Sequence, residues 1–116
     1  MQNDLNYAYR EIDGIKIVDL TGSLTSATVD VINEKIKTAS EKESLIINLV
    51  NVKLVTTTGL NFLVEASILC KGFGRRIIIL WPSDDFLQMV DQLDLHEFLT
   101  FADSIEEGRM KIMHYT

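Results

Sequence analysis

The chain has 116 residues, 47% of them hydrophobic, and a formal net charge of −6. This length suits one domain with its own core, and the negative charge argues against nucleic-acid binding, which requires a basic face. Residues 64–70 and 77–81, the longest apolar runs, are too short to span a bilayer, and the lone Cys70 excludes an intrachain disulfide. With no signal peptide at its start, the sequence predicts one cytoplasmic domain over residues 1–116 that uses no membrane.

A hairpin followed by a helix is predicted for the first 40 residues. Residues 5–12 alternate weakly, residues 15–20 are rich in β-branched side chains, and the Asp13-Gly14 turn signal separates them. We expect residues 21–23 to end the second strand, and Thr25 or Ser26 to cap the helix that follows. The apolar positions of that helix follow helical spacing and are Val29, Ile32, Ile36 and Ala39.

Strands and helices alternate in the rest of the chain. Residues 45–50 and 76–81 are nearly continuous apolar runs, which are typical of strands covered on both faces. Between them, residues 60–71 form a strongly apolar helix that glycines close. A helix with an acidic first turn begins at residues 82–85. A short strand over 98–101 and a helix from a capping box at 103–106 complete the chain.

This order predicts an α/β fold with a mixed, mainly parallel central sheet. The antiparallel element comes from the first hairpin, whereas each helical crossover joins parallel strands. Such a short chain cannot cover both faces of a large sheet, and we therefore expect the helices largely on one face.

Hydroxyl side chains gather just before the second helix, at Thr56, Thr57 and Thr58, and Gly59 follows them. Threonine oxygens in this place can accept hydrogen bonds from the free amides of the first helical turn. The glycine permits close approach of a partner, or simply close packing. The pattern alone leaves a capping role and a binding site both open.

The chain resembles the STAS domain family of the anti-sigma factor antagonist type along almost its whole length. The resemblance lies in the turn at residues 20–24, the strand that ends at Leu49, the segment 56–60 and the Gly72-x-Gly74 exit. Family members usually carry Asp-Ser-Ser-Gly-Leu where this chain has residues 56–60. The hydroxyl before the glycine is phosphorylated by a partner serine/threonine kinase that is also an anti-sigma factor. By resemblance that residue is Thr58, and Thr57 is the weaker candidate.

The resemblance also implies the mode of action. The unphosphorylated protein would bind the anti-sigma factor and release a sigma factor, and the phosphorylated protein would let its partner go. Threonines stand at 25 and 56, and Asn48 at the end of a strand, where the family commonly has acids. The implied partner-binding residues are Ser23, Thr25, Thr56, Thr57, Thr58, Gly59, Leu60, Asn61 and Phe62.

Two other functions stay open beside this one. The first is a STAS scaffold subunit that is never phosphorylated and self-associates as a homo-oligomer within a signalling assembly. The second is an enzyme, such as a small hydrolase, for which the sequence offers little. His96 and His114 lie outside the hydroxyl-rich segment, and no zinc-ligand spacing or glycine-rich phosphate loop occurs. We therefore expect no catalytic residue, metal or cofactor.

Overall fold

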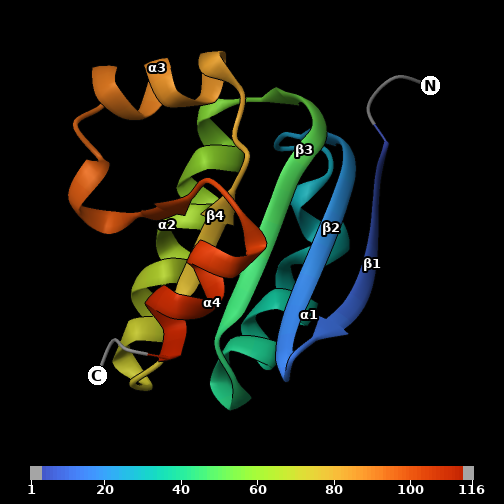
Figure 1. Cartoon of the computed structure of the whole chain (residues 1–116). Helices are drawn as coiled ribbons and strands as arrows, with labels where there is room; N and C mark the ends of the chain where they lie inside the picture. The colour runs from blue at the N-terminus through green and yellow to red at the C-terminus, as the bar shows by residue number, and fades with distance from the viewer. Residues whose placement is uncertain (1–3, 114–116) are drawn as a thin grey trace.

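One mixed β-sheet in the order β1-β2-β3-β4-β5 organises the part of the chain that the structure, a computed structural model, describes, residues 4–113 (Figure 1). β1 and β2 pair antiparallel, and the other three neighbouring pairs are parallel. In chain order the elements are β1 (Leu5–Ile12), β2 (Ile15–Leu24), α1 (Val29–Lys42), β3 (Leu45–Val55), α2 (Thr57–Gly72), β4 (Ile77–Leu80), α3 (Asp84–Gln92), the 3₁₀ turn η1 (His96–Phe98), β5 (Thr100–Ala102) and α4 (Ile105–Met113).

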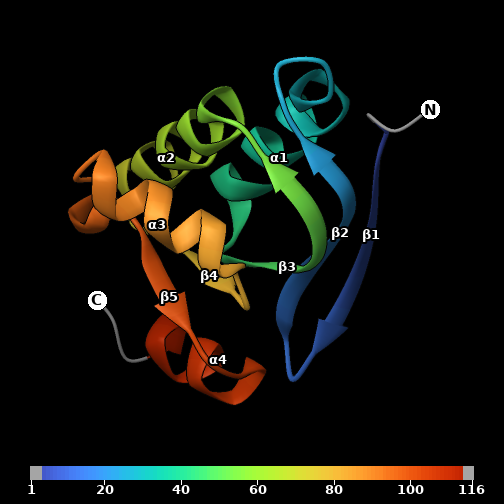
Figure 2. The same ribbon diagram turned by 90° about the horizontal axis from the view of Figure 1, so that it is seen from above.

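The helices divide unequally between the two faces of the sheet (Figure 2). α1, α2 and α3 bury Ile36, Leu63 and Phe86 in the main core, against the side chains of one sheet face. α4 packs Ile105 against a smaller core on the other face, built on Ile46 and its neighbours. The predicted fold class is confirmed: the sheet is mixed and mainly parallel, and most helices lie on one face.

The hairpin between β1 and β2 forms as predicted. Asp13 and Gly14 have φ angles of 52° and 82°, and two consecutive positive φ values are the signature of the tight turn that matches strand twist. The register then runs without a break from Ile12↔Ile15 to Leu5↔Gly22.

The predicted end of the second strand, at residues 21–23, is wrong, because β2 continues to Leu24. Its register against β3 shifts twice, and Gly22 has a φ of 118°. A side chain at Gly22 would collide with the backbone of Asp4, whose carbonyl accepts a hydrogen bond from the Ser23 amide. The glycine therefore marks a bulge inside the strand instead of its end.

The predicted cap of the first helix, at Thr25 or Ser26, is also wrong. α1 begins at Val29 after a turn in which the Thr25 carbonyl accepts hydrogen bonds from the amides of Thr28 and Val29. The Thr28 hydroxyl donates to the Ser23 carbonyl at 2.7 Å and accepts from the Thr25 amide at 2.9 Å. These buried bonds hold residues 25–28 as a turn and delay the helix.

β3 and α2 are both longer than predicted. β3 runs to Val55 because residues 51–55 keep pairing with β2 beyond the last residue that pairs with β4. α2 begins at Thr57, three residues before the predicted Leu60, so the threonines lie in its first turn and not before it. Near the chain end, η1 occupies residues predicted as strand, and β5 is confined to Thr100–Ala102.

Candidate functional site

The first turn of α2 is fixed to the end of β2. Thr56 is the N-cap of α2, and its side-chain oxygen accepts a hydrogen bond from the Gly59 amide at 3.4 Å. Its own amide donates to the Leu24 carbonyl at 3.1 Å, and its carbonyl accepts from Leu60. The capping role of Thr56 is therefore confirmed, and this threonine is half-buried.

Thr57, Thr58 and Asn61 are the exposed members of the predicted site. Within residues 4–113 the side chains of Thr57 and Thr58 form no hydrogen bond. Their hydroxyls are consequently available to a visiting molecule, whereas the Thr56 oxygen is occupied by its cap.

Five other predicted contact residues are buried. Ser23 and Thr25 are 6% and 7% exposed, Leu60 is fully buried, and Gly59 and Phe62 are also classed as buried. The Thr25 oxygen accepts a hydrogen bond from the Ala27 amide, so it serves the turn before α1. The structure thus places these residues in support of the surface formed by the exposed three.

A groove between α1 and α2 begins at Thr58. Its volume is about 340 Å³. Asn61 and Glu65 lie three and seven residues after Thr58 and therefore share its helical face. The residues that line the groove are Val29, Asp30, Asn33, Lys37, Thr58, Asn61, Phe62 and Glu65.

Sequence reasoning missed four of these groove residues: Asp30, Asn33, Lys37 and Glu65. The first three recur at helical spacing on the polar face of α1, but that pattern is also typical of a solvated helix surface. Only the parallel packing of α1 beside α2 brings them to Thr58. In the described residues no salt bridge involves Asp30, Lys37 or Glu65, so their charges face the groove unpaired.

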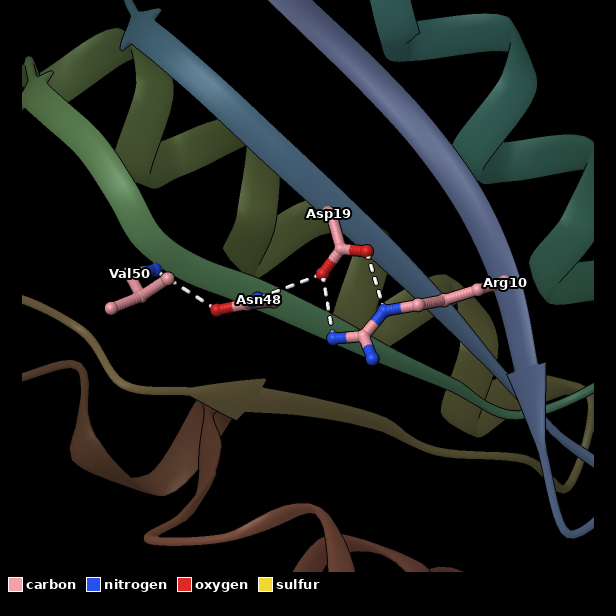
Figure 3. A network of polar contacts seen from close by, with 4 residues as sticks. All are labelled: Arg10, Asp19, Asn48 and Val50. Carbon is pink, nitrogen blue, oxygen red and sulfur yellow. Dashed lines mark hydrogen bonds and ion pairs between the residues drawn. The ribbon is translucent and has the colours of Figure 1, made fainter.

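A polar network occupies the opposite face of the sheet, beyond the cover of α4 (Figure 3). Arg10 donates two hydrogen bonds to Asp19, at 2.6 and 3.1 Å. The Asn48 amide nitrogen donates to Asp19 at 2.7 Å, while its carbonyl oxygen accepts from the Val50 amide at 3.0 Å. The Arg10 hydrogen bond, opposed by burial and aided by Asn48, holds the pKa of Asp19 below its ordinary value.

The network explains why an amide suits position 48. Asn48 is 6% exposed and uses its side chain as donor and acceptor at once. A carboxylate there could not donate to Asp19 and would place a second negative charge beside it. Because the network lies across the sheet from α1 and α2, it shapes the sheet and does not contact the groove.

The described residues contain little that could support catalysis. No cluster of three or more His, Cys, Asp or Glu side chains that could hold a metal occurs among residues 4–113. His96 is exposed and lies 3.4 Å from Asp91, and His114 is outside the described residues. None of the helices over the same range has the length and apolar character needed to cross a membrane.

Solved structures that share this fold include several anti-sigma factor antagonists. One from Mycobacterium paratuberculosis has a TM-score of 0.81 at 13% identity and covers 97% of both chains. The phosphorylated Bacillus cell fate determinant SpoIIAA has a TM-score of 0.69 at 19% identity, covering 91% of this chain and 98% of its own. RsbS from Moorella thermoacetica has a TM-score of 0.74 at 16% identity, covering 90% and 92%.

The match to a protein family is broader than any of these pairwise likenesses. No curated protein matches this chain significantly. The family profile described as "STAS domain", however, matches residues 6–108, which include every strand but the first residue of β1 and all of the groove. With the strand order, the helices on one face and the first turn of α2 as described, the chain belongs to the STAS domain family.

Proposed function

We propose that this chain is a regulatory binding domain that captures an anti-sigma factor, itself a serine/threonine kinase, and thereby frees a sigma factor. In this proposal residues 1–116 act as one cytoplasmic STAS domain without catalytic activity. The observation that carries it is the exposed, unbonded Thr58 hydroxyl at the head of the α1–α2 groove. The solved relatives described as anti-sigma factor antagonists support the same role.

Docking would use the rim of the groove. Thr57, Thr58 and Asn61 supply exposed polar groups, while buried Leu60 and Phe62 hold the first turn of α2 in place. The main chain there is fixed at both ends of the turn by the Thr56 hydrogen bonds. A partner therefore meets a rigid surface and spends little free energy on ordering it.

Phosphorylation of Thr58 would switch this surface off. A phosphate adds about −1.5 to −2 charges to one hydroxyl. The first turn of α2 contains no acidic residue, so its free amides and helix dipole can accept the added charge without unfolding the domain. The groove already carries Asp30 and Glu65 against Lys37 alone, and a docked partner would have to desolvate a dianion beside them.

A phosphorylation-free scaffold is the second candidate. It is favoured by Thr56, which stands where the family usually has an aspartate and whose oxygen is taken up by the cap. Without that carboxylate a kinase has one charged group fewer with which to orient the Thr58 hydroxyl. In that case the same surface would bind a second subunit of a signalling assembly permanently.

Partner capture with matched variants tests the proposal. Tagged wild type, Thr58→Glu and Thr38→Glu are each exposed to extract of the source cells, and the bound proteins are identified by mass spectrometry. Thr38 is exposed on α1 outside the groove, so its variant controls for charge alone. We expect wild type and Thr38→Glu to retain an anti-sigma factor kinase and Thr58→Glu to lose it.

Two results would overturn the proposal or its switch. Equal retention of the kinase by Thr58→Glu means that the surface at Thr58 is not where the partner docks. If the captured kinase with ATP leaves Thr58 unmodified while it labels a control substrate, the phosphoswitch is wrong and the scaffold candidate gains.

A further inference from the structure

A second, smaller pocket lies at the other end of α2 from Thr58. It is formed where the end of α2 meets the start of β4, η1 and the start of β5, and its volume is about 40 Å³. Its lining is mostly polar, and the polar and charged members are Ser67, Lys71, Arg75, Arg76, Glu97 and Thr100.

The charge of this pocket is opposite to that of the whole protein. Lys71, Arg75 and Arg76 bring three positive charges to it and Glu97 brings one negative charge, although the chain carries −6 overall. The Arg75 side chain is anchored by a 2.9 Å hydrogen bond to the Phe73 carbonyl. Such a local excess of bases attracts an anion.

Ser67 adds an unused hydrogen-bonding group. Its hydroxyl oxygen is buried and has no hydrogen-bond partner among the described residues. A buried hydroxyl without a partner costs free energy and calls for an explanation, because nearly all such groups are satisfied in native proteins. A ligand with acceptor oxygens in the pocket would supply the missing bond.

The size of the pocket matches a tetrahedral oxyanion. A water molecule needs about 10–15 Å³ of such a volume, so about 40 Å³ holds three or four oxygen-sized atoms. The negative end of the α2 dipole does not prevent this, because the last carbonyls, those of Cys70 and Lys71, already accept hydrogen bonds from the amides of Phe73, Gly74 and Arg75.

We propose that this pocket binds a phosphate-type oxyanion, either free or as the phosphoryl group of a phosphate monoester. Lys71, Arg75 and Arg76 neutralise it, and the hydroxyls of Ser67 and Thr100 donate hydrogen bonds to its oxygens. The site is independent of the Thr58 surface, so it stands or falls separately from the proposed function.

The test measures thermal unfolding and amide NMR shifts of the full chain with inorganic phosphate, with phosphoserine, and with NaCl at equal ionic strength. The variants are Ser67→Ala, Lys71→Gln and Glu97→Gln, and Lys53→Gln is the control for charge, since Lys53 is exposed on β3 away from the pocket. We expect phosphate to raise the Tm beyond the NaCl reference and to shift amides of residues 74–77 and 97–100.

The variants separate this site from general salt effects. Lys71→Gln and Ser67→Ala should each weaken phosphate binding by about tenfold, the worth of one charge-assisted hydrogen bond. Glu97→Gln should strengthen binding, and Lys53→Gln should leave it unchanged. Without phosphate, Ser67→Ala should keep or raise the Tm, because it removes an unsatisfied hydroxyl; this shows that its lost response is not a folding defect.

The outcomes are decisive in both directions. A response to inorganic phosphate but not to phosphoserine assigns the pocket to the free anion, and an equal or tighter response to phosphoserine assigns it to phosphorylated ligands. A phosphate effect no larger than that of NaCl, or one that Lys53→Gln lowers as much as Lys71→Gln, refutes the site and leaves ordered water as the partner of Ser67.

Discussion

Gly59 is the residue whose replacement should damage the candidate site most directly. A Cβ built there would lie 2.8 Å from the Leu24 carbonyl carbon and closer still to its oxygen. Both are backbone atoms, and the same carbonyl accepts the Thr56 amide, so α2 must move away from β2 to make room. Elsewhere in a helix, glycine to alanine stabilises by about 0.5–1 kcal/mol. Here the overpacking should dominate and destabilise Gly59→Ala by about 1–3 kcal/mol.

Gly72→Ala is the matched control, because Gly72 is also in α2 and a Cβ there meets nothing within 4 Å. Urea and thermal unfolding followed by circular dichroism measure both variants. We expect Gly59→Ala to lower the Tm by about 4 °C for each kcal/mol lost, and Gly72→Ala to keep or raise it. If Gly59→Ala is as stable as Gly72→Ala, the close contact between β2 and α2 does not constrain the site as argued.

Three further predictions concern the rest of the fold. Because the folded pKa of Asp19 is lowered, its ion pair with Arg10 stabilises above the unfolded pKa of about 3.9 and is lost as the pH falls through the folded value. Asp19→Asn should therefore cost no more than about 1 kcal/mol at pH 7, and its stability should converge with that of wild type in urea titrations below about pH 4. Burial raises the pKa of Cys70 to about 11, so iodoacetamide at pH 8 should alkylate the native thiol at least about 100-fold more slowly than the unfolded one; equal rates would refute its burial. Ser83→Ala removes the cap on the Phe86 amide and should cost about 1 kcal/mol in the same urea titrations, and an unchanged midpoint would contradict that role.

Local sequence signals predicted the elements whose cause is local. The hairpin follows from Asp13-Gly14, since these residues adopt the positive φ angles that the turn requires. The third helix follows from Ser83 at its cap and the acids after it. In these cases the residues that determine the conformation are neighbours in the chain.

The errors share the opposite cause. Residues 21–24 stay in β2, and residues 51–55 stay in β3, because the two segments pair with each other, about 30 residues apart in sequence. α1 starts late because the buried Thr28 hydroxyl bonds back to Ser23. A glycine in the strand and a row of threonines indicate breaks locally, and only their distant hydrogen-bond partners reverse that signal.

The sequence by itself determined the class of fold, the family resemblance and the hydroxyl-rich first turn of α2, because alternating patterns and a short motif are properties of adjacent residues. Tertiary structure alone decided which hydroxyls are exposed and which acids of α1 lie beside them. It also decided that Ser67 and three bases meet in a second pocket. Exposure and proximity depend on how α1, α2 and the sheet pack together, and no local pattern encodes the distance between side chains on different elements.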